Sequence, residues 1–395
     1  MNRWGWGLLP VVLLAGLVVM FKVTDPTRPF RAAFPPVEDL TIERVSFPEL
    51  GKVAVRVVNG GPEPVTVAQV LVDDAFWTFS ADPGPTVARL RSATFSLDYP
   101  WVEGEPHVIA LLTSTGLTFE HEVAVATLSP AANSRYLATF AALGAYAGIV
   151  PVLLGLLWYP FLRRVGRQWV RFYLCFTVGL LTFLAVDAAE HVLEAALGVP
   201  EGFQGVGLAL LGVLGAVVVL RAIGGSGRRR RSERGVPESP LPVAYLVAVG
   251  IGLHNFGEGL AIGSAYALGE IALGAFLVIG FMLHNTTEGL AIVAPVARSR
   301  PRLRHFAFMG LTAGVPTVIG AWAGGFSFSP TLATFLLALG LGAILQVVGQ
   351  VARLVTTDRG QHADAPAPSL FSPLNAAGLA LGAVVMYATA LAVTG

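Results

Sequence analysis

The amino-acid sequence predicts an all-α polytopic membrane bundle that is preceded by a signal-anchor helix and a small extracytoplasmic β-sandwich. Three observations lead to this fold class. The 395 residues are 54% hydrophobic and only 13% charged, well below the roughly 25% charged residues that are usual in soluble domains. Apolar runs long enough to span a bilayer recur after residue 134. A polar stretch with alternating apolar positions separates them from an apolar N-terminus.

The charge and the cysteine content restrict the function classes. The formal net charge is +1, and the basic residues form no continuous stripe, so nucleic acid is not an expected partner. The lipid bilayer is the expected environment. The single cysteine, Cys175, lies in an apolar run, which excludes an intrachain disulfide and a cysteine-based zinc site. Any metal site must therefore use histidine, carboxylate and amide groups.

Two segments are expected before the bundle. Residues 1–24 contain the apolar run Trp4 to Phe21 without a clear small-residue cleavage motif, so we expect a signal anchor, with a cleaved signal peptide as the alternative. Residues 25–130 are polar, with alternating stretches such as Val53 to Val58 and turn residues such as Asn59-Gly60-Gly61-Pro62. We expect a small extracytoplasmic β-sandwich of the immunoglobulin type there.

Residues 134–394 are expected to form eight membrane helices, and every second connection between them carries arginines. The positive-inside rule places these connections and the N-terminus in the cytoplasm, and the β-domain and the C-terminus outside. We therefore expect a multi-pass protein of the plasma or inner membrane. The apolar runs lie near residues 134–160, 170–197, 203–222, 241–268, 270–297, 303–326, 330–352 and 373–394. The arginines are Arg163, Arg164, Arg167 and Arg171, then Arg228 to Arg231 with Arg234, then Arg298, Arg300, Arg302 and Arg304, then Arg353 and Arg359.

One motif occurs twice, on two successive predicted helices. On a helix, residues four apart lie on one face, one turn from each other, so the histidine and the glutamate of each copy can bind one ion. Consecutive helices run in opposite directions and both copies lie near mid-helix, so the two pairs are expected to meet near the bilayer centre. The copies are His254-Asn255-Phe256-Gly257-Glu258-Gly259-Leu260-Ala261-Ile262 and His284-Asn285-Thr286-Thr287-Glu288-Gly289-Leu290-Ala291-Ile292.

Two imidazoles and two carboxylates suit zinc and similar divalent ions. Asn255 and Asn285 either add oxygen ligands or support the ligands through hydrogen bonds. The alternative interpretation is that these polar residues only hold helices together. Ionisable groups at this depth cost at least about 2.5 kcal/mol each on insertion scales. Four of them in matched register favour a functional site.

The repeated H-N-x-x-E-G-L-A pattern resembles the fourth and fifth helices of the ZIP (Zrt- and Irt-like) family of divalent metal transporters, in its bacterial branch. The resemblance covers residues 134–394 as an eight-helix unit. It implies that the direct metal ligands are His254, Asn255, Glu258, His284, Asn285 and Glu288.

The sequence departs from the family pattern at three positions. Gly257 and Thr287 replace a proline that the family has in each motif, so a kink at the first motif depends on glycine. Val315-Pro316 stands where the family often has a Glu-Pro pair. Because the additional glutamate would support a second ion, we expect one tightly held metal per subunit. Compensation by Asp187 or Glu190 is the alternative.

A second polar cluster lies in the predicted helix 170–197. Asp187, Glu190, His191 and Glu194 occupy positions i, i+3, i+4 and i+7 and share one face. Asp187 and His191 are the deepest of the four, and we interpret them as metal-binding residues of an external vestibule. The alternative is that the charges mark a helix end that emerges into water.

The sequence therefore predicts a carrier, and not an enzyme, that moves a divalent metal ion, zinc first, into the cytoplasm by alternating access around the mid-membrane site. Zinc is here a transported substrate and not a catalytic cofactor. Two rival functions are an intramembrane zinc metalloenzyme, which would need an asymmetric site with a dedicated general base, and a metal-sensing or adhesion protein that works through the β-domain. A homodimer is one assembly open to this chain, and the sequence assigns no partner to the β-domain.

Overall fold

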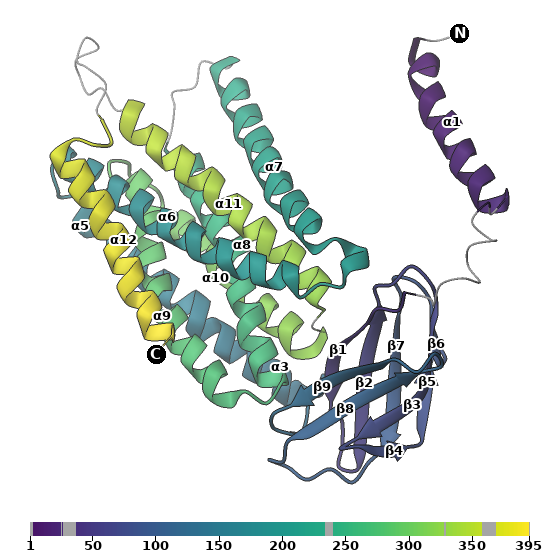
Figure 1. The fold of residues 1–395 in the computed structure, drawn as a ribbon. Coiled ribbons are helices and arrows are strands. Elements are labelled where there is room, and N and C mark those ends of the chain that lie inside the picture. Colours follow the sequence, from purple (N-terminus) through teal and green to yellow (C-terminus); the bar gives the residue numbers. More distant parts are fainter. Residues whose placement is uncertain are drawn as a thin grey trace.

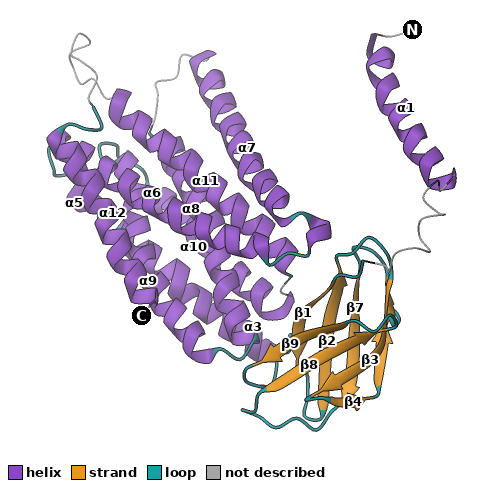
Figure 2. Ribbon diagram, in the orientation of Figure 1, coloured by secondary structure: helices purple, strands orange, loops and turns teal. Residues whose placement is uncertain are grey.

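The computed structural model describes residues 3–24, 26, 37–233, 240–327, 329–357 and 369–394. Helices dominate the chain, and the β-strands are confined to one region near the N-terminus (Figures 1 and 2). The predicted fold class of a helical membrane bundle with a small β-region is confirmed at this level. Residues 27–36, within the predicted β-domain, lie outside the described residues.

Helix α1 (Arg3–Thr24) stands apart from the rest of the molecule in Figure 1. Its apolar side chains are largely exposed, for example Val12 at 64% and Val23 at 79%. Lipid is the environment that covers such a surface at no hydrophobic cost. This exposure fits the expected signal anchor.

Residues 40–123 form two antiparallel sheets, with the strand orders β1-β2-β7-β5 and β4-β3-β8-β9, and β6 pairs with β3. The alternation along strand β2 explains why this segment forms part of a sheet with one buried face. Val53, Val55 and Val57 are buried and alternate with the more exposed residues between them. Buried residues of both sheets belong to one hydrophobic cluster. The strands are β1 (Leu40–Ser46), β2 (Lys52–Asn59), β3 (Val65–Val72), β4 (Ala75–Trp77), β5 (Phe79–Asp82), β6 (Thr86–Val87), β7 (Ser92–Asp98), β8 (His107–Thr113) and β9 (Thr118–Val123).

The bundle begins at α3, where the Asn133 side chain accepts a hydrogen bond from the Tyr136 backbone N–H at 3.0 Å and caps the helix. Seven helices of the described residues are long and apolar enough to cross a membrane. The segments are α3 (Ser134–Gly144), η1 (Ala145–Ile149), α4 (Val150–Leu156), α5 (Tyr159–Leu162), α6 (Arg167–Leu197), η2 (Glu201–Phe203), α7 (Gly205–Glu233), α8 (Leu241–Ala267), α9 (Ile271–Val293), η3 (Ala294–Val296), α10 (Leu303–Ser327), α11 (Pro330–Thr357) and α12 (Pro373–Thr394).

The helices pack in two groups. In the first group, α8 packs along α10, α9 packs against α4, and α10 also contacts α3 and η1. In the second group, α6 packs against α12 and α11, and α11 packs against α7. The main contact between the groups joins α8 to α11. Both copies of the repeated motif lie in the first group.

The β-region contacts one end of the bundle. Arg44 donates from Nη1 to the Phe326 carbonyl oxygen at 3.3 Å, at the end of α10. Gly60 and Gly202 approach closely where the β-region meets the α6–α7 connection: a methyl group at Gly202 would lie 2.1 Å from the Gly60 carbonyl oxygen. The two parts therefore share an interface (Figure 1).

Two of the predicted arginine connections lie together at the opposite end. The Tyr159 hydroxyl donates to the Ser299 carbonyl oxygen at 2.6 Å, and the Arg163 guanidinium lies 5.7 Å from the centre of the Tyr159 ring. This clustering is the arrangement that the charge pattern predicts. Arg234 and Arg359 lie outside the described residues, as do the side chains of Arg228 to Arg231.

Candidate metal centre

The repeated motif places its polar residues in the middle of α8 and α9, where the two helices face each other. Asn255, Asn285 and Glu288 are fully buried, and Glu258 and His284 are 4% and 5% exposed. Polar side chains at this depth are costly unless they bind one another or a ligand. The contacts of each therefore decide what the site can do.

Glu258 contacts three other polar residues of the site. His284 donates from Nε2 to Glu258 Oε1, and the same oxygen lies 3.3 Å from His254 Nε2. The second oxygen, Oε2, accepts a hydrogen bond from Asn285 Nδ2 at 2.7 Å. Three of the four groups that were expected to meet, His254, Glu258 and His284, therefore come together in the structure.

The ligand atoms of His254, Glu258 and His284 all lie within 4.8 Å of one another. A tetrahedral zinc ion holds its nitrogen and oxygen ligands at about 2.0–2.2 Å, so neighbouring ligand atoms are then about 3.3 Å apart. The separation of 3.3 Å between His254 Nε2 and Glu258 Oε1 matches this spacing. Small side-chain movements suffice to place all three groups around one ion.

Both asparagines are anchored on backbone carbonyls of neighbouring helices. Asn255 donates from Nδ2 to the Ala313 oxygen of α10 at 3.2 Å, and Asn285 donates to the Ala147 oxygen of η1 at 2.9 Å. Ala147 is available because Pro151, four residues later, has no N–H to donate to it. The local π-helix at residues 145–149 thus presents a carbonyl to the site, as such bulges often do.

These anchors leave several oxygen atoms without a donor. Within the described ranges, no hydrogen-bond partner reaches the buried Oδ1 atoms of Asn255 and Asn285, or either carboxylate oxygen of Glu288. Buried acceptors are normally paired, and a cation satisfies several acceptors at once. The donor set therefore fits a divalent metal ion of the zinc class.

The site is less symmetrical than the sequence repeat. The two copies were expected to form a symmetrical site, but Glu258 contacts both histidines and Asn285. Glu288 has only the weaker influence of the Asn255 side chain, and no described residue meets hydrogen-bond geometry with its oxygens. The two helices run in opposite directions and contact different neighbours, so equivalent sequence positions meet different surroundings.

Close helix packing holds the first motif, on α8, against α10. A methyl group at Gly259 would lie 2.0 Å from the Thr317 carbonyl oxygen, and one at Gly320 would lie 2.1 Å from the Phe256 carbonyl oxygen. Only glycine permits this approach of the two backbones.

Helix α10 presents the Ala313 carbonyl oxygen to the site. The Thr317 hydroxyl is buried and lies where a side chain at Gly148 would be, and no hydrogen-bond partner reaches it within the described ranges. Val315 is half-buried, and the contact with Asn255 comes from Ala313. Sequence reasoning missed the contribution of the Ala147 and Ala313 carbonyls. The prolines at 151 and 316 within apolar runs were the available signal for disturbed helices.

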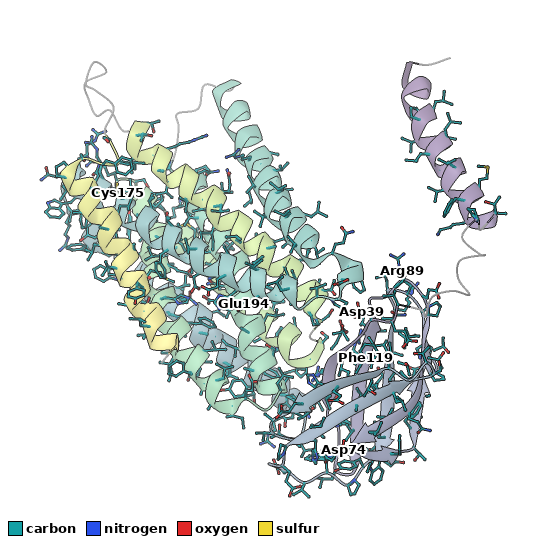
Figure 3. All side chains as sticks on the ribbon, in the orientation of Figure 1. Asp39, Asp74, Arg89, Phe119, Cys175 and Glu194 are labelled. Atoms are coloured by element: carbon teal, nitrogen blue, oxygen red, sulfur yellow. The ribbon has the colours of Figure 1, made fainter. Side chains whose placement is uncertain are left out.

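Asp187 and His191 do not join this cluster. Their side chains are 36% and 62% exposed, and His191 Nδ1 bonds to the Asp187 carbonyl oxygen at 3.0 Å within its own helix. Helix α6 packs mainly against α11 and α12, which leaves this face at the surface. Glu194 of the same stripe is labelled in Figure 3. The exposure agrees with the alternative of charges at a solvated helix surface.

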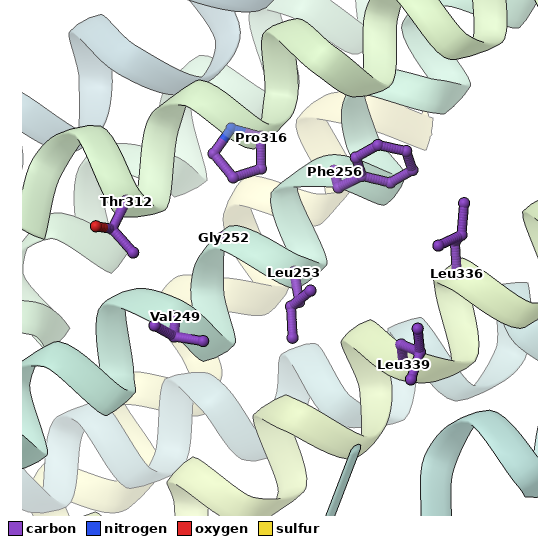
Figure 4. A pocket seen from close by; sticks show the side chains of 8 residues that line it. All are labelled: Val249, Gly252, Leu253, Phe256, Thr312, Pro316, Leu336 and Leu339. Carbon is purple, nitrogen blue, oxygen red and sulfur yellow. The ribbon is translucent and has the colours of Figure 1, made fainter. Parts of the chain in front are cut away.

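An apolar cavity of about 220 Å³ lies between α8, α10 and α11 (Figure 4). Its α8 wall consists of Val249, Gly252, Leu253 and Phe256. At 100° per residue, this face of α8 points away from the face that carries His254 and Glu258. The cavity is therefore separate from the metal centre.

No protein-family model matches this chain, and no curated protein matches it either.

Proposed function

We propose that this protein moves a divalent metal ion, zinc first, across the membrane and into the cytoplasm. The observation that carries the proposal is that His254 and Glu258 of the first motif copy and His284 of the second lie close together between the helices. The orphaned oxygens of Asn255, Asn285 and Glu288 add further acceptors. The proposal includes membership of the ZIP family, which rests on the repeated motif.

The charge balance supports a divalent ion as cargo. Glu258 and Glu288 are buried between helices and together supply two negative charges, which neutralise one divalent cation in a medium where unbalanced charge is costly. The ion-pair partners that the structure shows for Glu258 are His254 and His284. The same balance supports one metal per subunit.

The division of the helices into two groups supports alternating access. The ligands belong to α8 and α9 in one group, while α6, α7, α11 and α12 form the other. Displacement of one group against the other would open the site to each side in turn without breaking it. The proposed orientation has the N-terminus in the cytoplasm, and the β-region and C-terminus outside, in the plasma or inner membrane.

Zinc uptake by the purified full-length protein in sealed vesicles tests the proposal. We expect Glu258→Gln and His284→Ala to abolish uptake, because each removes a group of the buried cluster. Glu270→Gln is the matched control, since Glu270 is an exposed carboxylate at the start of α9. Near-normal uptake by both site variants, at wild-type levels of inserted protein, would refute the proposed site.

The asymmetry of the two glutamates favours one alternative, an intramembrane zinc metalloenzyme. In that function His254, Glu258 and His284 would bind zinc, and Glu288 would act as general base on a metal-bound water. The two functions differ in the vesicle experiment: a carrier accumulates zinc inside, whereas an enzyme binds zinc without moving it. A metal sensor would also bind without transport, and deletion of the β-region would then remove its output.

A further inference from the structure

We infer that the junction between the β-region and the bundle binds one anionic phospholipid, with its phosphate at the β-region and its acyl chains against the helices. The site is a cavity of about 400 Å³ lined by both parts of the molecule. It is separate from the metal centre and does not depend on the proposed transport.

The β-region supplies a charged wall. Glu43 and Arg56 form an ion pair, with Arg56 Nε 3.2 Å from Glu43 Oε2, and Arg56 Nη2 donates to Ser92 Oγ at 3.4 Å. The Glu43 side chain is 3% exposed and holds the guanidinium in place, while Arg56 itself is 51% exposed. Arg91 lines the same cavity and is exposed. Two arginines against one glutamate leave one net positive charge.

The helices supply an apolar wall. Phe203, Leu208, Leu332 and Phe335 line the cavity from η2, α7 and α11. Leu211 lies one turn beyond Leu208 on the same face of α7, and it is 67% exposed. An acyl chain can therefore follow this face from the cavity into the surrounding lipid.

The position of the cavity favours a lipid as occupant. It lies at the first turns of α7 and α11, where membrane helices emerge and lipid headgroups lie. A guanidinium recognises a phosphate by charge-assisted hydrogen bonds, and the apolar wall recognises hydrocarbon. A free phosphate would use only the charged wall, and a neutral lipid only the apolar one. A bound lipid would also link the β-region to the bundle.

The full-length protein in phosphatidylcholine nanodiscs, titrated with phosphatidylglycerol and followed by native mass spectrometry, provides the test. We expect one retained phosphatidylglycerol per chain, and about a tenfold weaker association in Arg91→Ala, as expected for loss of one charge-assisted contact. Arg89→Ala is the matched control: Arg89 is an exposed arginine of the same loop (Figure 3) that does not line the cavity. An equal effect of both variants would show nonspecific attraction and overturn the inference.

A second variant tests the apolar half. Leu208→Trp fills the cavity from α7 without a change in charge, and it should weaken lipid retention by a similar factor. Thermal unfolding in pure phosphatidylcholine checks that each variant is folded. Soluble glycerol phosphate distinguishes a lipid from a free anion: it should compete poorly. Full competition by glycerol phosphate, with unchanged binding in Leu208→Trp, would show a simple anion site and refute the lipid assignment.

Discussion

We expect Glu288→Gln to stabilise the metal-free protein while it weakens metal binding. Glu288 is fully buried. No described residue meets hydrogen-bond geometry with either of its oxygens, and the Asn255 side chain is a polar neighbour that favours its charged form. It also lies close enough to Glu258 for the two carboxylates to interact electrostatically. Since an unpaired buried charge is unfavourable, a neutral amide should raise the free energy of unfolding without metal by on the order of 1 kcal/mol.

The effect on zinc follows from binding linkage. Zinc at about a hundred times its dissociation constant stabilises the folded protein by about 2.7 kcal/mol. Loss of a buried charged ligand that contributes about 2.7 kcal/mol raises the dissociation constant about a hundredfold. At the same zinc concentration, the variant then gains only about 0.4 kcal/mol.

Thermal unfolding in detergent, with a chelator or with zinc, measures both effects. Glu258→Gln should behave differently, because Glu258 is held by His284 and Asn285, so the metal-free protein should lose stability as well. Glu270→Gln should change neither quantity. A Glu288→Gln protein that loses metal-free stability and keeps the full zinc shift would mean that Glu288 is a structural residue and not a ligand.

Three further outcomes are expected. Gly259→Ala should disrupt the α8–α10 contact and reduce zinc binding. Gly215→Ala on α7 should not reduce zinc binding, because a methyl group there meets nothing within 4 Å. Equal zinc binding by the two variants would refute the packing argument. Asp39 is labelled in Figure 3. Burial and, to a smaller extent, the Glu201 charge raise the pKa of the Asp39 carboxyl, and a hydrogen bond from the Glu201 backbone offsets this only in part. Docking of the β-region should therefore be strongest at low pH and weaken as pH rises through this raised pKa. Hydrogen exchange in residues 198–204 measures this, and the pH dependence should disappear in Asp39→Asn. Deletion of residues 1–130, with a replacement signal where insertion needs one, should preserve zinc transport, because the ligand cluster lies in the bundle; complete loss in a correctly inserted truncation would show that the β-region takes part.

The sequence by itself determined the membrane class, the β-region and the pairing of the two motifs. A long apolar run predicts a membrane helix because, in lipid, the backbone N–H and C=O groups of a single segment find hydrogen-bond partners only within a helix. The i, i+4 spacing places His254 beside Glu258 in any α-helix. These features depend on local periodicity and on the solvent, so no knowledge of distant contacts is needed to predict them.

Only the tertiary structure decided which partners each ligand meets. The repeat predicts a symmetrical site, yet the packing of α8, α9 and α10 gives Glu258 close partners in His284 and Asn285. It leaves the Glu288 oxygens without a described residue at hydrogen-bond geometry. The acidic face of α6 was expected to line an external vestibule, with a solvated helix end as the alternative. The packing of α6 against α11 and α12 leaves Asp187 and His191 exposed and outside the ligand cluster. Helix rotation and neighbour choice depend on the sum of many distant contacts, which spacing along one helix does not encode.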